Sequence, residues 1–135
     1  MKNLVVARYR DGRVVKGASL DVDPARPTCH VREGTNPAVE VKLSDLKALF
    51  FVRSLEGDPK RDEGLVPGEK DPRSRGMALV KLRFPDGETI VGLTIRYPPN
   101  RPYFFVLPVD QNSNNIRILV NREAVVAMEE GSQSL

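Results

Sequence analysis

Apolar and polar residues alternate along two stretches that lie far apart in the chain. In residues 5–9 every second position is Val, Ala or Tyr, and in residues 80–84 every second position is Val, Leu or Phe. A period of two with β-branched and aromatic residues is typical of a half-buried strand. Asp11-Gly12 follows the first stretch and Asp86-Gly87 follows the second. Because glycine tolerates positive φ and aspartate can bond the turn backbone, each pair predicts a hairpin turn.

The two stretches belong to a longer internal repeat. At an offset of 75, residues 5–31 align without a gap on residues 80–106, with nine identities in 27 positions. The identical pairs are Val5/Val80, Arg8/Arg83, Asp11/Asp86, Gly12/Gly87, Gly17/Gly92, Pro24/Pro99, Arg26/Arg101, Pro27/Pro102 and Val31/Val106. After a loop that is two or three residues longer in the second copy, residues 39–43 match residues 116–120. The sequence therefore predicts a first repeat at 1–53 and a second at 77–129.

Each repeat predicts five short strands, and the second strand is unusual. It contains a glycine at the same place in both copies, Gly17 and Gly92, and is expected to continue inward through Leu20 or Ile95. A glycine inside a strand weakens it, so a repeated one indicates a bulge or a sharp bend. A bent second strand lets five antiparallel strands curl into a closed small barrel without exposed edges. The predicted fold is mainly β: two five-stranded, strongly bent antiparallel small barrels.

The fifth strand of the first repeat is apolar on both faces. Residues 48–52 read Ala-Leu-Phe-Phe-Val without interruption. A strand with one solvated face would alternate, so this one is expected to be covered on both sides. A repeat of about 50 residues buries only a small core. The two repeats are therefore expected to pack together, or each to form a homo-oligomer.

The segment between the repeats differs sharply in composition. Residues 54–76 contain eleven charged residues and few large apolar ones, which predicts a solvated, flexible linker. Residues 130–135 are interpreted as a polar tail. With a single cysteine, no apolar run long enough to span a bilayer and no signal-peptide pattern, we expect a cytoplasmic protein without membrane contact.

The excess positive charge behind the net charge of +3 is modest and confined to the first repeat. The net charge divides into +4 for residues 1–53, −1 for residues 54–76 and zero for residues 77–135. A phosphate-binding surface usually needs a dense basic face. The charge alone is therefore explained as well by ordinary solubilising side chains as by a nucleic-acid surface.

The repeated Pro-x-Arg-Pro loops are the first candidate binding feature. Arg26-Pro27 and Arg101-Pro102 stand in stiff loops that present an arginine at small entropic cost. Two such arginines could bind a phosphate or carboxylate through paired hydrogen bonds. In the alternative interpretation, the prolines shape the turn and the arginine covers the end of the fold.

Tyr103 and Phe105 follow the second loop, and His30 stands at the position equivalent to Phe105. Outward aromatic residues beside a basic loop suit base stacking, although burial in a contact between the two repeats is the more common explanation for such residues. The candidate partner-binding residues are Arg26, Pro27, His30, Arg101, Pro102, Tyr103 and Phe105, and the structural glycines are Gly12, Gly17, Gly87 and Gly92. With one His, one Cys and no phosphate-cradling glycine loop, the sequence predicts no catalytic, metal or cofactor site.

The segment from Asp11 to Pro24 resembles the first motif of Sm-like proteins. It contains a strand, an Asp-Gly turn, a bent strand with Gly17 and a loop bearing Asp21 and Asp23, and residues 86–95 are similar as far as Gly92. This resemblance implies an Sm-like small barrel, with RNA bound through the loops after the second and fourth strands; SH3-like barrels share the bent-strand pattern. The whole chain also resembles an uncharacterised bacterial group of duplicated small β proteins, some attached to signalling domains.

These observations lead to two functional hypotheses of different classes. The first is a non-catalytic adaptor or regulatory module that binds another protein, which the duplicated stiff loops and the doubly covered strand favour. The second is an Sm-like protein that binds RNA or single-stranded nucleic acid through Arg8, Arg10 and Arg26.

Overall fold

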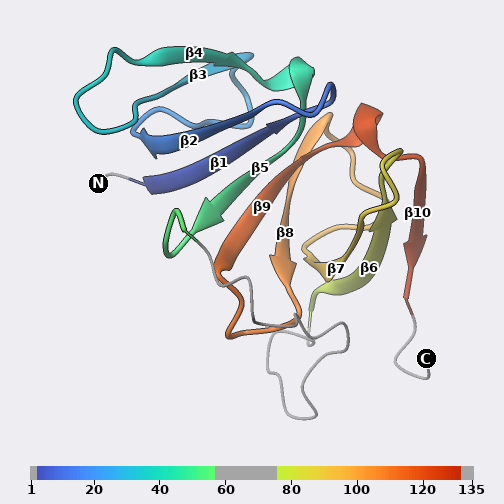
Figure 1. Ribbon diagram of the computed structural model, residues 1–135. Coiled ribbons are helices and arrows are strands. Elements are labelled where there is room, and N and C mark those ends of the chain that lie inside the picture. The colour runs from blue at the N-terminus through green and yellow to red at the C-terminus, as the bar shows by residue number, and fades with distance from the viewer. Residues whose placement is uncertain (1–2, 57–75, 132–135) are drawn as a thin grey trace.

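The chain forms mainly β structure, and the computed structural model describes residues 3–56 and 76–131 (Figure 1). Residues 57–75, most of the expected linker, lie outside the described residues. The elements are β1 (Asn3–Tyr9), β2 (Val14–Ser19), β3 (Thr28–Val31), β4 (Val39–Lys42), the 3-10 helix η1 (Leu43–Asp45), β5 (Leu46–Val52), β6 (Ala78–Arg83), β7 (Thr89–Thr94), β8 (Tyr103–Pro108), β9 (Asn115–Asn121), the 3-10 helix η3 (Arg122–Ala124) and β10 (Ala127–Glu130).

Eight of these strands form one antiparallel sheet that runs through both halves of the chain. Its order is β10-β6-β7-β8-β9-β5-β1-β2, and β3 and β4 form a separate antiparallel pair. The two halves meet where β5 pairs with β9, with Leu49 opposite Leu119 and Phe50 opposite Ile118. The chain is therefore joined across its middle by backbone hydrogen bonds between strands that are far apart in sequence.

The expectation that each half closes into its own barrel is wrong. Within the described residues, β5 pairs with β1 and with β9 of the other half, and β10 pairs with β6 alone. All seven residues of β5 are buried, whereas most of β10 is exposed. A strand without a polar face gains most when both faces and both edges are covered. The pairing between halves supplies that cover, and closure of the first half alone would not.

The expectation that β5 is covered on both faces is confirmed, because its side chains alternate between two cores. Ala48, Phe50 and Val52 contribute to a core built mostly from the second half. Leu49 and Phe51 contribute to a core built mostly from the first half, which Leu119 of β9 also enters. Each core thus combines residues from both halves, so that neither half is packed without the other.

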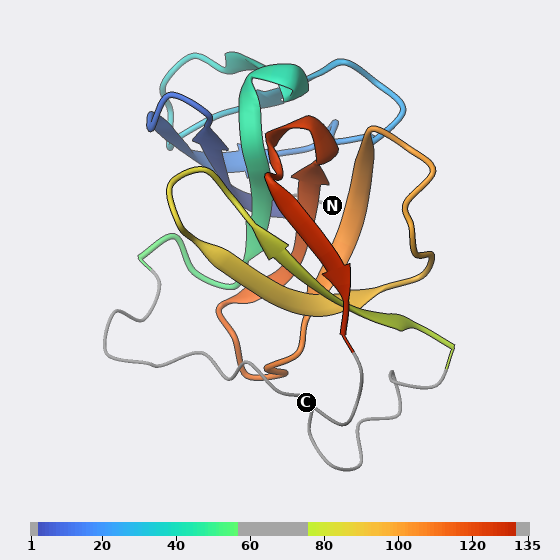
Figure 2. The same cartoon turned by 90° about the vertical axis from the view of Figure 1, so that its right-hand side faces the viewer.

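Gly17 and Gly92 occupy corresponding places, opposite Val5 and Val80. The register runs unbroken through both glycines, so the expected bulge is not what requires them. A Cβ atom at Gly17 would collide with the backbone carbonyl of Arg32, and one at Gly92 would collide with the carbonyl of Leu107. The third strand therefore crosses close to the second, and Figure 2 shows β7 strongly curved at this crossing.

The correspondence between the halves changes after the third strand. Thr28 pairs with Lys42, and Tyr103, its equivalent at an offset of 75, pairs with Asn121. The fourth strands therefore correspond at an offset of 79, and not at the 77 that the residue match at 39–43 indicates. Thr28 and Lys42 are 14 positions apart and Tyr103 and Asn121 are 18 apart, so the second half has four more residues between its equivalent third-strand and fourth-strand positions. Val41 thus matches Val120, and the apolar pattern is preserved in this alignment.

Candidate binding groove

A groove with a volume of about 570 Å³ lies beside β8, between the loops that follow β2 and β7. In Figure 2 these two loops lie on the same side of the molecule. The first loop contributes Pro24, and β9 contributes Arg117. The other lining residues come from the second half and are Met77, Thr94, Ile95, Arg96, Pro99, Asn100, Arg101, Tyr103, Phe104, Phe105 and Leu107.

The apolar wall of the groove follows from the alternation of β8. Phe104, Val106 and Pro108 are buried, and Tyr103, Phe105 and Leu107 between them are half-buried. Successive side chains of a strand point to opposite faces, so the half-buried set forms one continuous surface. That surface lines the groove instead of being sealed inside the core.

The loop from residue 95 to 102 is fixed by η3 and β10. The guanidinium of Arg122 donates to the carbonyl of Pro99 at 2.6 Å, and the backbone N–H of Arg122 donates to the carbonyl of Pro102 at 2.9 Å. The hydroxyl of Tyr97 donates to the carbonyl of Met128 at 3.3 Å. The bond between Tyr97 and Pro98 is cis. These contacts hold the loop, while Ile95 at its start is 84% exposed.

Three arginines give the groove its charge. Arg96 and Arg101 are exposed on the loop, and Arg117 projects from β9. The guanidinium carbon of Arg117 lies 4.2 Å from the ring centroid of Phe51 and 4.6 Å from that of Phe105. No acidic residue lines the groove, and within the described part of the chain none of the three arginines forms an ion pair. The groove is therefore apolar and cationic.

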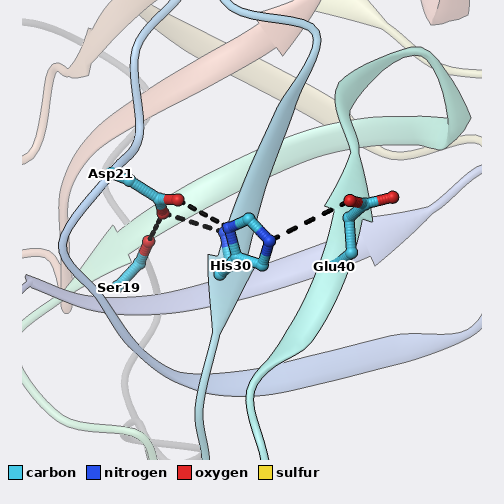
Figure 3. Close-up of polar contacts among 4 residues, drawn as sticks. All are labelled: Ser19, Asp21, His30 and Glu40. Carbon is cyan, nitrogen blue, oxygen red and sulfur yellow. Dashed lines mark hydrogen bonds and ion pairs between the residues drawn. The ribbon is translucent and has the colours of Figure 1, made fainter.

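The equivalent surface of the first half has different chemistry (Figure 3). Ser19, Asp21 and His30 stand where Thr94, Arg96 and Phe105 stand in the second half. One Asp21 oxygen accepts from the backbone N–H of His30 at 2.8 Å and from the Ser19 hydroxyl at 3.1 Å. The other lies 2.7 Å from Nδ1 of His30. The apolar and cationic wall is thus replaced by a polar cluster.

The same contacts shift the proton affinities of the cluster. The hydrogen bond to Asp21 raises the pKa of His30 above its ordinary value. Burial alone would raise the pKa of Asp21, but the hydrogen bonds from His30 and Ser19 together lower it. Glu40 of β4 lies 3.9 Å from Nε2 of His30. Because Ser19 bonds Asp21 and not the imidazole, the arrangement lacks the contact by which histidine activates a hydroxyl nucleophile.

The structure brings some of the predicted site residues together and separates others. Arg101, Tyr103 and Phe105 line the groove. Arg26 is exposed, 3.9 Å from Asp23, and does not line it. The carbonyl of Pro27 accepts from the N–H of Leu43, as that of Pro102 does from Arg122, so both prolines hold the turn before a 3-10 helix. His30 belongs to the polar cluster.

Sequence reasoning missed Arg96, Arg117 and Ile95 as groove residues. Leu20 and Ile95 were expected to point inward, but they follow the ends of β2 and β7 and are 77% and 84% exposed. Arg117 reaches the groove through its pairing opposite Phe51.

The turn glycines lie where the sequence predicts them. Gly12 and Gly87 adopt positive φ in the predicted turns, at 97° and 90°.

Comparison with known proteins places the whole fold in one family. Residues 1–131 match the model of a family of unknown function, DUF6982. The chain belongs to DUF6982. The match covers both halves, so the DUF6982 unit includes the pairing of β5 with β9 and the groove beside it. No curated protein and no solved structure matches the chain.

Two further observations concern the parts of this DUF6982 chain that the structure describes. No helix in these parts has both the length and the apolar character needed to cross a bilayer. Their His, Cys, Asp and Glu side chains do not gather in groups of three or more that could hold a metal ion.

Proposed function

We propose that the protein is a non-catalytic adaptor that binds a segment of a protein partner in the groove beside β8. One observation carries this proposal: a long apolar wall is bordered by three arginines that form no ion pair within the described residues. Ligand sites are typically concave and mostly apolar, with a few polar groups that fix orientation. Arg96, Arg101 and Arg117 have the placement of such polar groups.

The exposed side chain of Ile95 supports the same proposal. Ile95 is a large apolar side chain at the rim of the groove and is 84% exposed. Single exposed apolar residues are common on protein surfaces. Here, however, Ile95 is continuous with Tyr103, Phe105 and Leu107, which lie half-buried in the same groove. The apolar area would leave water when a partner segment is bound.

The proposal includes the origin of the site. We infer that the two halves are copies of one five-stranded unit of Sm-like or SH3-like type. The matched crossings of Gly17 with Arg32 and of Gly92 with Leu107 support this inference. In the first half, the position of the groove is taken by the cluster of Asp21 and His30. We therefore expect one groove per chain and not two.

Single-stranded nucleic acid is the second candidate ligand. Arginines next to Tyr103 and Phe105 are the combination on which bases stack. Against this, the second half carries no net positive charge and the groove is mostly apolar. A phosphate chain gains from a dense basic surface more than from an apolar wall. We therefore favour a peptide segment.

A display selection tests the peptide site. A random peptide library is selected on the full-length chain, and the recovered peptides are measured against Ile95→Asp and Leu20→Asp. Leu20 is the matched control, because it is the equivalent residue, is 77% exposed and does not line the groove. Peptides that lose binding to Ile95→Asp alone support the proposal.

Three results contradict it: no enrichment over a bare support, binding that survives Ile95→Asp, or equal loss with both variants. A single-stranded oligonucleotide is added as a competitor. If the oligonucleotide binds more tightly than every recovered peptide and requires Ile95, nucleic acid replaces the peptide as the ligand.

A further inference from the structure

The aromatic setting of Arg117 suggests what the groove recognises. The rings of Phe51 and Phe105 have centroids 6.0 Å apart and are tilted by 58°. The guanidinium carbon of Arg117 lies within 4.6 Å of both centroids, so the group rests in the corner between the rings. Arginine stacks on aromatic faces while its N–H groups remain available at the edge of its plane. Arg117 is thus held in place without a carboxylate.

The pairing of the two halves creates this setting. Phe51 belongs to β5 of the first half and stands opposite Arg117 of β9. Phe105 belongs to β8 and stands opposite Leu119, two positions along β9. Neither half alone brings the two rings to one arginine. Only the joined halves place an oriented cation at the wall of the groove.

We propose that Arg117 is the specificity residue of the groove and that it binds a carboxylate of an acidic, apolar peptide segment. This inference rests on the proposed function, because it names the chemistry of the occupant of the same groove. Charge complementarity supports it, since Arg96 and Arg101 add positive charge and no acidic residue lines the groove. A guanidinium matches a carboxylate with two parallel hydrogen bonds, which a lysine ammonium does not.

Three labelled peptides of equal length test the inference directly on the full-length chain. One alternates Glu and Leu, the second alternates Gln and Leu, and the third alternates Lys and Leu. Binding is measured by fluorescence anisotropy at two salt concentrations. We expect the Glu peptide to bind about tenfold more tightly than the Gln peptide, and its binding to weaken in high salt. The Lys peptide should bind least.

Arg117→Lys is the decisive variant, because it retains the charge and loses the paired geometry. We expect this variant to weaken binding of the Glu peptide by about fivefold or more and to leave binding of the Gln peptide unchanged. Arg13→Lys is the matched control: Arg13 also stacks on a ring, 4.3 Å from the centroid of Tyr9, but does not line the groove. Circular dichroism verifies that each variant is folded, and the comparison of the Glu and Gln peptides on the unchanged protein needs no variant.

The outcomes separate this inference from the proposed function. Equal binding of the Glu and Gln peptides, with both lost in Ile95→Asp, overturns the role of charge and leaves the groove as the site. Binding of the Glu peptide that survives Ile95→Asp shows that the acidic segment binds elsewhere and overturns the inference. No binding of the Glu peptide also overturns it, while the display selection judges the groove independently.

Discussion

The ammonium group of Lys47 lies 2.8 Å from a carboxylate oxygen of Asp86 and joins the two halves beyond their paired strands. Lys47 lies on β5 of the first half, and Asp86 lies in the turn between β6 and β7 of the second. The ammonium also pairs with Glu88 and lies 4.9 Å from the ring centroid of Phe84. Lys47 is only 8% exposed, whereas both acids are largely solvated. Because Lys47 is buried and the two acids are not, the charge of Lys47 depends on its partners for stabilisation, whereas water can solvate the acids.

Removal of the two acids should therefore cost more stability than removal of the cation. In Asp86→Asn/Glu88→Gln, the buried ammonium keeps its charge and loses its ionic partners, and we expect a loss of about 1–3 kcal/mol. Lys47→Met keeps the apolar stem and leaves two carboxylates that water can solvate, so it should cost less than about 1 kcal/mol. Urea unfolding measures both, with Lys81→Met at an exposed position of β6 as the control. A larger loss for Lys47→Met would contradict this explanation.

The pH dependence of stability should reveal the cluster around His30. The hydrogen bond to Asp21 raises the pKa of His30 in the folded protein above 6.5. The stability that protonated His30 contributes is therefore complete below pH 6.5 and is lost as the pH rises through this raised pKa. Hydrogen bonds lower the pKa of Asp21 below 3.8, so its effect is present above 3.8 and is lost as the pH falls. The difference in Tm between the wild type and His30→Gln should therefore be largest between pH 3.8 and 6.5. A difference that grows above pH 7 would contradict it.

The sequence predicted the strands, the turns and the doubly covered β5, because these follow from local alternation and glycine chemistry. It did not predict which strand pairs with β5, because hydrogen-bonding edges are the same for every strand and only long-range packing selects β9. The groove depends on that choice, since Arg117 and Phe51 meet through the same pairing. Tyr103, Phe105 and Arg101 could be predicted from one loop and strand, whereas Arg117 required the arrangement of both halves.

The exposed edge of β10 should resist self-association because of its charge. By its pairing with β6, β10 is the equivalent of β5, with Glu129 and Glu130 where β5 has Phe50 and Phe51. Charged residues on an edge strand oppose pairing with another chain. We expect Glu129→Phe/Glu130→Phe to form oligomers at concentrations at which the wild type shows less association, as measured by sedimentation velocity. Glu129→Gln/Glu130→Gln removes charge without adding apolar surface and should have the smaller effect. An unchanged sedimentation coefficient for the Phe variant would contradict this role of the charge.

Gly17 and Gly92 should tolerate alanine less well than an exposed turn glycine does. The added Cβ at Gly17 would meet the backbone of Arg32, just after β3, and the one at Gly92 would meet a methyl group of Val106 and the carbonyl of Leu107 in β8. These atoms move only if the crossing opens. We expect Gly17→Ala and Gly92→Ala each to cost about 1–3 kcal/mol, as overpacking in a tight region does. At Gly87 the φ is 90° but nothing lies within 4 Å of the added carbon, so Gly87→Ala reports backbone strain alone, about 1 kcal/mol. Thermal or urea unfolding of the three variants separates the two causes. Equal losses in all three would mean that the crossing does not require glycine.

The two arginines of the Pro-x-Arg-Pro loops should differ from each other, although the repeat makes them equivalent. Both are exposed, and within the described residues neither guanidinium donates to a backbone carbonyl, so alanine at either should change stability by less than about 0.5 kcal/mol. Arg101 lines the groove, so Arg101→Ala should weaken the binding of the peptide, whereas Arg26→Ala should leave that binding unchanged. Arg122→Ala is the contrasting variant, because its guanidinium bonds the carbonyl of Pro99 at 2.6 Å, and its loss should cost about 1–3 kcal/mol. Thermal melts and peptide anisotropy on the three variants assign a role to each arginine. A clear loss of stability in both Arg26→Ala and Arg101→Ala would show that the repeated arginines serve folding, and Arg101 would then be removed from the site.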